Sequence, residues 1–376
     1  MVVKTMKDMK KILLICLLAT AFAACSKDSG TVGETGEKVD IRILPTVVSA
    51  EAGQATRARI SGTAFPVNSQ LGLAVKTSPS NVSINAIYDN VMSLYNGTTW
   101  GYYLDGVYSG TVLAGFKDWG AINLCGYYPY NASATNIAAV PFRIASGSPT
   151  ATASEEQVTV DYMVAAPKTK DLLNNMPAGY LSLEFSHVMT AIDIRLRRAY
   201  VGPDITLVKA KFEIAAPRSF TVAGTINAMT PSMTDMGSNI TANETVQVLE
   251  VAYNKVVTYR SDYLQSPLLI LPELRQNGTL VNAEMKITLY FNDTNGNPFV
   301  FEDRDATNSD GNGNPVITFN LSAIDNTAGG SADKGFLAGS VYTVQASIGN
   351  YVKFAGVPKI VQETLDDAGN PEYIEI

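Results

Sequence analysis

Apolar and polar residues alternate through much of the chain, and the pattern first appears in residues 39–48. There Val39, Ile41 and Ile43 share one face, and the polar residues between them face the other way. Because successive side chains of an extended strand point to opposite faces, this pattern predicts a half-buried β-strand. The small-residue segment that follows, residues 49–59, is expected to be a loop.

Similar segments recur at short intervals. The dipeptide Asn96-Gly97 separates residues 91–95 from residues 100–104, and Asn-Gly between alternating segments is a strong hairpin signature. A second hairpin is expected around the loop at residues 292–297. The other expected strands are residues 71–75, 158–164, 181–185, 188–197, 205–214, 316–321, 341–348, 351–354, 360–361 and 373–376. No segment keeps a helical period beyond about three turns, so we expect an all-β fold built of β-sandwiches.

Composition supports this fold class and its size. Hydrophobic residues make up 46% of the chain and charged residues only 17%, and the 18 Tyr and 13 Phe favour strands. A chain of 376 residues is long enough for two domains, although one large domain also fits. The segment Asn-Asn-Met-Pro-Ala-Gly ending at residue 179 is the expected junction. We therefore expect an N-terminal β-sandwich domain at residues 39–178 and a C-terminal one at residues 179–376.

The first residues predict export. Four lysines precede a short apolar run, and small residues then lead to Cys25. This is the layout of a secretory signal peptide, and its apolar run is too short to span a bilayer. The cysteine at the cleavage point indicates a lipoprotein, so residues 1–24 are expected to be the signal peptide. Residues 25–38 are polar and Gly-rich, which is typical of a flexible spacer.

Charge and cysteine content narrow the function classes. The net charge of −7, without a basic stripe, argues against a nucleic-acid partner. Cys16 leaves with the signal peptide and Cys25 carries lipid. Cys125 then has no partner for an intramolecular disulfide, and we expect it to be a buried structural thiol rather than a reactive one.

Catalytic and metal-binding motifs do not stand out. His187, the only histidine, lies inside a strand pattern, and a packed or hydrogen-bonded role is favoured over catalysis. Residues 308–313 and 293–297 resemble the start of calcium loops but lack the later acidic ligand, which favours plain Asn/Gly turns. The paired acids at residues 155–156, 302–303 and 366–367 are expected to be solvated rather than a glycosidase pair. We therefore expect no enzyme activity, no cofactor and no metal.

Several short segments occur in a distinctive order along the chain: Ala23-Ala24-Cys25, Thr56-Arg57-Ala58, Gly62-Thr-Ala-Phe65-Pro, Tyr88-Asp-Asn90, Trp100, Gly126-Tyr-Tyr-Pro-Tyr130, residues 157–165, Leu183-Glu-Phe-Ser-His187 and Gly339-Ser-Val-Tyr-Thr-Val344. Together these segments resemble the fimbrillins, the type V pilus subunits of Gram-negative anaerobes, and especially their Mfa-like branch. The chain departs from many relatives by lacking a Trp near its last strand. Its role as a shaft, tip or anchor subunit therefore stays open.

The resemblance implies two tandem transthyretin-like β-sandwich domains and a route to the cell surface. The precursor would reach the outer membrane as a lipoprotein, and an Arg-specific protease would then remove its N-terminal segment. Arg57 best matches the family's cleavage site, and Arg59 is a close rival. The vacated groove would accept a strand from another fimbrial subunit, giving a head-to-tail fimbrium that meets a ligand on host or bacterial surfaces.

The residues themselves agree with this route. A strand that precedes an Arg-bearing loop can be cut away, which leaves an unpaired edge that recruits another strand. Our candidate donor is the C-terminal segment, where Ile360, Val361, Tyr373 and Ile374 are strand-like. The alternative hypothesis is a monomeric outer-membrane glycan-binding lipoprotein, which has no use for proteolysis at Arg57. A secreted glycoside hydrolase is a weaker third hypothesis, because no catalytic pair of acids stands out.

Overall fold

A computed structural model describes most of the chain after the spacer. The described residues are 37–47, 64–77, 86–116, 120–147, 149–171, 181–198, 201–215, 218–229, 240–259, 264–265, 269–271, 274–276, 283–301, 309–324, 334–348, 359–365 and 371–375. Throughout these ranges the regular structure is strand, with two short 3-10 turns, Gln157–Thr159 and Leu321–Ala323, and no α-helix. The predicted all-β fold is confirmed.

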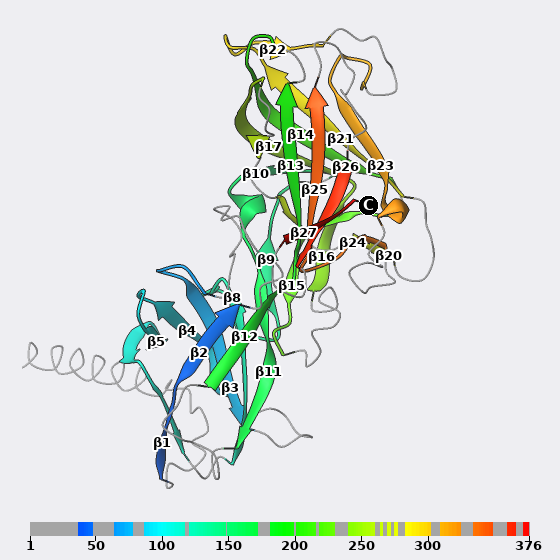
Figure 1. Cartoon of the computed structure of the whole chain (residues 1–376). Coiled ribbons are helices and arrows are strands. Elements are labelled where there is room, and N and C mark those ends of the chain that lie inside the picture. Colours follow the sequence, from blue (N-terminus) through cyan, green and yellow to red (C-terminus); the bar gives the residue numbers. More distant parts are fainter. Residues whose placement is uncertain are drawn as a thin grey trace, which may run out of the picture.

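Sheet 1 dominates the lower half of the view in Figure 1. In order of pairing, its described strands are β2 (Ile43–Val47), β12 (Leu181–His187), β11 (Met163–Asp171), β8 (Ala121–Tyr128), β3 (Gln70–Thr77), β4 (Ala86–Tyr95), β5 (Trp100–Leu104) and β6 (Val107–Gly110). The hairpin predicted at Asn96-Gly97 joins β4 to β5, and Gly97 has a φ of 97° that suits glycine.

Sheet 2 pairs β1 (Lys38–Ile41) with β7 (Leu113–Phe116). Side chains from sheets 1 and 2 meet in a cluster that we call the first core. Its buried members are Ile41, Ile43, Val47, Phe65, Leu71, Leu73, Val75, Val91, Trp100, Tyr102, Leu113, Phe116, Ile122, Leu124, Met163, Ala165, Leu183 and Phe185.

The other sheets lie mostly in the upper half of Figure 1. Sheet 3 consists of β16 (Ile240–Val246), β15 (Phe220–Ile226) and β9 (Val140–Arg143). Sheet 4 consists of β10 (Thr150–Ser154), β17 (Val248–Val257), β14 (Ile205–Ile214), β21 (Glu284–Asn292), β22 (Pro298–Phe299) and β23 (Val316–Asn320). Sheet 5 consists of β18 (Leu264–Gln265), β19 (Leu269–Leu271), β13 (Thr190–Arg198), β25 (Val341–Ile348), β26 (Lys359–Leu365) and β27 (Pro371–Glu375). Sheet 6 pairs β20 (Leu274–Gln276) with β24 (Lys334–Phe336).

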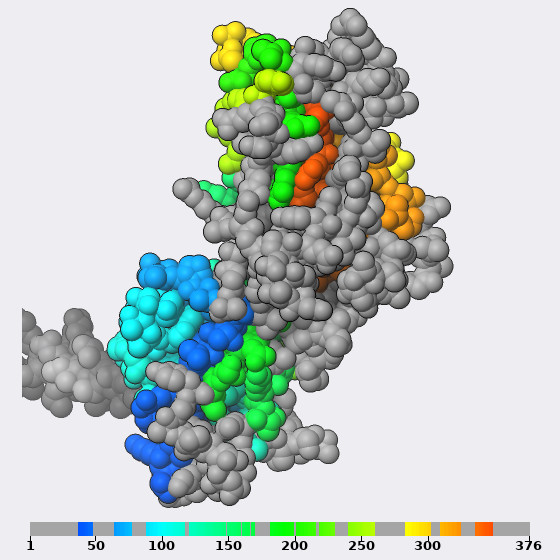
Figure 2. Space-filling model, in the orientation of Figure 1, coloured from blue at the N-terminus to red at the C-terminus, as the bar shows by residue number. Residues whose placement is uncertain are grey.

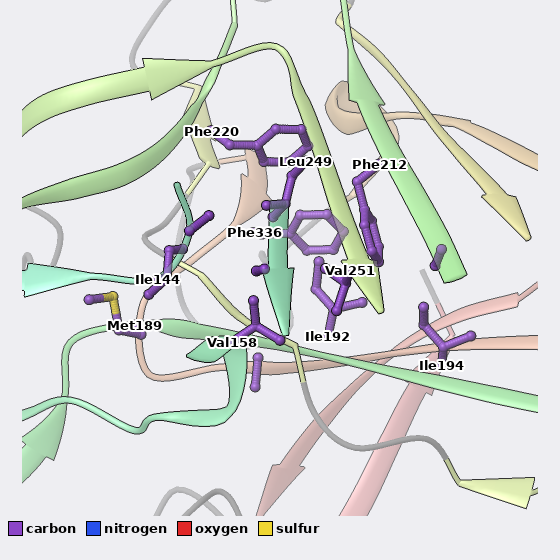
Figure 3. Close-up of a cluster of buried hydrophobic side chains, with 14 of the residues drawn as sticks. Ile144, Val158, Met189, Ile192, Ile194, Phe212, Phe220, Leu249, Val251 and Phe336 are labelled. Atoms are coloured by element: carbon purple, nitrogen blue, oxygen red, sulfur yellow. The ribbon is translucent and has the colours of Figure 1, made fainter. Parts of the chain in front are cut away.

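A larger cluster, the second core, fills the space among sheets 3, 4 and 5 (Figure 3). Its buried members include Ile144, Val158, Met189, Ile192, Ile194, Phe212, Phe220, Leu249, Val251 and Phe336. Sheet 1 borders both cores, because its strands alternate. In β3, Leu73 and Val75 belong to the first core, whereas Ala74 between them belongs to the second.

The expected domain junction, residues 174–179, lies outside the described residues. Strands that precede this junction in the sequence share sheets with strands that follow it. Strand β12 comes after residue 178 but pairs within sheet 1. Strands β9 and β10 come before it but pair with β15 and β17. The division into residues 39–178 and 179–376 therefore stays a prediction, and strand pairing crosses it in both directions.

One expected strand is wrong in part. Residues 158–164 were expected to be extended, but a 3-10 turn occupies Gln157–Thr159 and β11 begins only at Met163. The Gln157 side chain accepts a hydrogen bond from the Ser154 amide (2.9 Å), and such local bonds compete with a sheet ladder. Val158 is nevertheless fully buried, in the second core. The strand expected at residues 351–354 lies outside the described residues.

Candidate functional site

The segment at residues 38–47 lies where the sequence predicts a removable strand. Its alternation is confirmed, because Ile41, Ile43 and Val47 are buried whereas Leu44 is 44% exposed. The strand is interrupted at Arg42, however, and its two halves pair in different sheets. In Figure 2 these blue residues lie beside green residues of sheet 1 on the visible face.

Backbone pairing ties the two halves to two strands that lie far apart in the sequence, β7 and β12. Strand β1 runs antiparallel to β7, with Ile41 opposite Leu113. Strand β2 runs parallel to β12, with Ile43 opposite Leu181 and Val47 opposite Phe185. Because β2 ends the pairing order of sheet 1 and β1 forms half of sheet 2, this one segment completes both sheets.

The buried side chains of this segment line the first core. Each large apolar side chain that is fully buried contributes ~1.5–3 kcal/mol. The Asp40–Arg42 ion pair (3.3 Å) is exposed on both sides and contributes little. We call the place that residues 38–47 occupy against β7 and β12 the groove. Hydrophobic contacts and backbone hydrogen bonds mainly hold the segment there.

A buried tyrosine adds a polar contact to this groove. The Ile43 amide donates a hydrogen bond to the Tyr102 hydroxyl (3.0 Å), which lies 3.4 Å from the Ile43 carbonyl oxygen, to which it donates. Tyr102 is 1% exposed. The alternation of residues 100–104 predicts that this ring faces a core, but nothing in the sequence shows that its hydroxyl meets a strand more than fifty residues away.

Phe65 marks where the chain returns after the Arg-bearing loop. Its ring packs edge-on against Phe185 (5.3 Å between centroids) and against Trp100 (5.5 Å). Phe185 is also the register partner of Val47, so the chain leaves and re-enters the first core beside the same residue. Arg57 and Arg59 lie between these two points, outside the described residues.

The candidate donor residues fall on the last two strands. Ile360 and Val361 belong to β26, which runs antiparallel to β25, and Tyr373 and Ile374 belong to β27, which pairs with β26. In the described part of sheet 5, β27 is the last strand of the pairing order. The C-terminal segment is thus strand, as predicted, and its donor role stays a prediction.

His187 is buried and paired, as the sequence analysis favoured. Its Nδ1 atom lies 2.9 and 3.0 Å from the two carboxylate oxygens of Asp161, and both side chains are almost fully buried. Met163 beside this pair belongs to the first core and Val188 to the second. The pair therefore lies where the chain crosses between the cores, and sequence analysis missed its partner Asp161.

Cys125 is a buried thiol, as predicted. It is 1% exposed, its Sγ atom lies 3.4 Å from Sδ of Met229, and burial raises the pKa of the thiol to about 12. A thiol with so high a pKa is a poor nucleophile near neutral pH.

In the two loops that resemble calcium sites, amide groups of the same loop donate hydrogen bonds to the acidic side chain. Asp293 accepts hydrogen bonds from the amides of Asn295 and Asn297, and Asp310 does the same with Asn312 and Asn314. These bonds hold the pKa of both carboxyls below the usual value. The plain-turn interpretation is favoured further, and no cluster of three metal-ligating side chains occurs among the described residues.

The paired acids give no catalytic arrangement in the part of the chain that the structure describes. Glu155 forms an ion pair with Lys255 (3.2 Å). The pairs at residues 302–303 and 366–367 lie outside the described residues, as does Cys25. Within the described ranges, no helix is long and apolar enough to cross a membrane.

A family model described as Fimbrillin-like matches residues 56–361. The chain belongs to the fimbrillin-like family. Family membership supports the role of a pilus subunit that associates with other fimbrial subunits on a cell-surface appendage. It also suggests a structural protein rather than an enzyme.

A comparison with solved structures found similar chains at low sequence identity. A candidate cell adhesion protein from Bacteroides ovatus is 16% identical, with a TM-score of 0.48, over 87% of this chain and 96% of that chain. A fimbrial assembly protein from Parabacteroides distasonis is 9% identical, with a TM-score of 0.36, over 90% and 100% of the two chains. A fimbrial protein from Bacteroides vulgatus is 12% identical, with a TM-score of 0.38, over 81% and 92%. A search of curated proteins found no match.

Proposed function

We propose that this fimbrillin-like chain is exported as a lipoprotein and assembles by strand exchange after Arg-specific proteolysis. The observation that carries the proposal is the position of residues 38–47. They complete two sheets and the first core, and yet they precede the arginines at positions 57 and 59. A single cut after either arginine separates this segment from the rest of the protein.

The uncut loop keeps the precursor closed. While residues 48–63 are intact, a strand that leaves the groove stays tethered and rebinds as an intramolecular event, at an effective concentration in the mM range. Cutting the loop makes rebinding bimolecular. The departed segment then exposes unpaired edges on β7 and β12 and an apolar groove, and such an edge recruits another strand.

The strand that replaces it comes from the C-terminal segment of another subunit. Strands β26 and β27 add to one edge of sheet 5, so both can leave without removing a strand from the middle of that sheet. Insertion of the tail of one subunit into the groove of the next is a head-to-tail contact. Because this contact does not close on itself, it builds a fibre.

The lipid on Cys25 remains with the excised segment. Residues 25–38 tether the strand to the outer membrane, so the same cut frees the subunit body for assembly. Changing Cys25→Ala is expected to abolish labelling by a fatty-acid probe and to release the protein or leave it unprocessed. Unchanged labelling of that variant contradicts the lipoprotein assignment.

Protease treatment of the purified precursor tests the switch. The wild-type chain is expected to give ladders that resist mild denaturant, whereas the double variant Arg57→Ala, Arg59→Ala stays monomeric. Removal of residues 357–376 is expected to prevent ladders without unfolding the first core. If the double variant polymerises as readily as wild type, the switch is wrong, and a monomeric glycan-binding lipoprotein becomes the better account.

We also propose that the chain is a structural protein without an active site. The buried His187–Asp161 pair, the high pKa of Cys125 and the self-closed acidic loops support this. A screen of glycosides, esters and peptides is expected to give no turnover. Reproducible turnover that a point substitution abolishes overturns the proposal.

A further inference from the structure

Among the described strands, β2 pairs with β12 along one edge and has no strand partner along the other, which we call the open edge. The Leu181 amide donates to the Arg42 carbonyl (2.6 Å), which fixes the phase of the parallel ladder. In such a ladder alternate residues of a strand direct both backbone groups to the neighbour. The backbone groups of Leu44 and Thr46 therefore point toward β12, and the backbone groups of Ile43 and Pro45 point away from it.

Tyr102 meets this open edge at one residue. Its hydroxyl accepts from the Ile43 amide (3.0 Å) and donates to the Ile43 carbonyl oxygen (3.4 Å), so it engages both outward backbone groups. Two residues later, Pro45 has no amide hydrogen to donate. Its backbone nitrogen points away from β12, so the ladder needs no hydrogen bond from it. The same edge therefore requires an N–H at position 43 and tolerates its absence at position 45.

The contact lies at the point where the segment changes partners. Strand β1 ends at Ile41, opposite Leu113 of β7, and β2 begins at Ile43, opposite Leu181 of β12. Tyr102 itself comes from β5, near the other end of the pairing order of sheet 1. A shift of the segment by one residue would move a polar side chain into the first core and present the wrong backbone groups to the hydroxyl.

We propose that the Tyr102 hydroxyl is the contact that sets the register of the strand in this groove. In the uncut chain that strand is residues 38–47. In the polymer that strand is an extended segment of a second subunit, and this part of the proposal rests on the proposed function. The partner must carry apolar side chains at the places of Ile41, Ile43 and Val47, with a free N–H at the place of Ile43. Of these two outward-facing positions, a proline fits at the place of Pro45 and not at the place of Ile43.

The uncut chain tests the first half of the proposal without any assembly. Hydrogen exchange of the Ile43 amide is measured after labelling with 15N-isoleucine, in wild type and in Tyr102→Phe. Because a hydrogen bond contributes modestly to stability, the variant is expected to exchange this amide about 2- to 10-fold faster. Tyr253→Phe, which removes a buried hydroxyl without a partner among the described residues, is the matched control and should leave the amide unchanged. Equal exchange in wild type and Tyr102→Phe overturns the proposal.

Peptides test the second half and separate it from the proposed function. The protein is cut, the excised segment is washed away, and two synthetic peptides of residues 38–47 are titrated, one of them N-methylated at Ile43. On wild type the methylated peptide is expected to bind about 2- to 10-fold more weakly, and on Tyr102→Phe the two peptides should bind alike. If methylation weakens peptide binding equally for wild type and Tyr102→Phe, the Tyr102 hydroxyl does not recognise the amide at the place of Ile43, and the proposal is wrong. If the unmodified peptide does not bind the cut protein at all, the vacated groove of the proposed function is wrong, and the exchange measurement alone decides the role of Tyr102.

Discussion

The two cores differ in where their residues stand relative to the Arg-bearing loop. The first core takes Ile41, Ile43 and Val47 from before that loop and its other members from after it. Among the described residues, the second core runs from Ala74 to Ile348 and has no member that precedes the loop. If a cut near residue 57 lets residues 38–47 leave, as we propose, the first core loses three of its described side chains and the second core loses none.

In the function that we propose, this difference lets the second core keep the body folded while the first core loses a strand. The strands near the two ends of the described chain also differ in how firmly they are held. The N-terminal segment is paired in two sheets and buried in the first core, whereas β27 pairs with β26 alone among the described strands. In the proposed function, the N-terminal segment therefore leaves only after a cut, whereas the C-terminal strands can leave without one.

Truncation in the second core is expected to have the largest effect. Phe212 is fully buried on β14, and Phe212→Ala should lower the free energy of unfolding by about 3–5 kcal/mol. Urea titration measures this loss. Release of residues 38–47 from the cut variant should keep its wild-type rate under native conditions, and a faster release means that the two cores are not independent.

Truncation in the removable strand should affect the first core alone. Ile43→Ala is expected to cost about 2–5 kcal/mol, because it leaves a cavity where the strand meets the core. Leu44→Ala, one residue away on the exposed face, is the matched control and should stay within about 0.5 kcal/mol. Hydrogen exchange by mass spectrometry checks whether β7 and β12 lose protection while β14 and β17 keep it. Loss of protection in all four strands would contradict the separation.

The His187–Asp161 pair offers a way to disturb both cores at once. Changing His187→Ala leaves the Asp161 carboxyl buried without this hydrogen bond, which should cost about 1–3 kcal/mol. The exposed pair of Asp40 and Arg42 is the control, and Asp40→Asn should cost below about 1 kcal/mol. If exchange rises in one core only, the pair does not couple the two.

The smallest expected effect is a pH dependence at the border of the cores. Burial raises the pKa of Cys125 from 9.0 to about 12, so the folded thiol stays neutral where the unfolded one ionises. Stability from this group is complete below pH 9 and declines as the pH rises toward 12, by roughly 1 kcal/mol at pH 10. Urea titrations at pH 8 and 10 should show this loss in wild type and not in Cys125→Ala. Equal losses in both proteins would assign the effect to other groups.

The hydrophobic pattern predicted most strands because each of them buries one face. The buried positions follow the alternation in residues 39–47 and 205–214, whereas the strand at residues 341–348 is buried on both faces. The pattern could not reveal that the first of these breaks at Arg42 and joins two sheets, because pairing partners depend on residues far away in sequence. It also failed at residues 158–162, which lie between the hydrogen bond that joins Ser154 to Gln157 and the start of β11 at Met163.

Burial was more predictable than pairing in the candidate site. The sequence indicated that Ile41, Ile43 and Cys125 would be buried, because apolar spacing carries that information. It did not indicate that Tyr102 contacts Ile43 or that Asp161 contacts His187, since each polar pair joins separate parts of the sequence. The roles of Cys25, Arg57 and Arg59 stay predictions, and these residues lie outside the described part of the chain.

A reversible tether on the removable strand tests the central claim most directly. Asp40 and Ala114 lie directly opposite each other on β1 and β7, and both side chains are exposed, so a disulfide in Asp40→Cys, Ala114→Cys should suit the spacing of an antiparallel pair. The unlipidated protein starting at Ser26 is oxidised, cut by an Arg-specific protease, and then divided into reduced and unreduced samples. We predict a monomer while the disulfide holds the strand in place, and denaturant-resistant ladders once reduction releases it. Ladders of equal yield in the unreduced sample would contradict the claim that departure of this strand starts assembly.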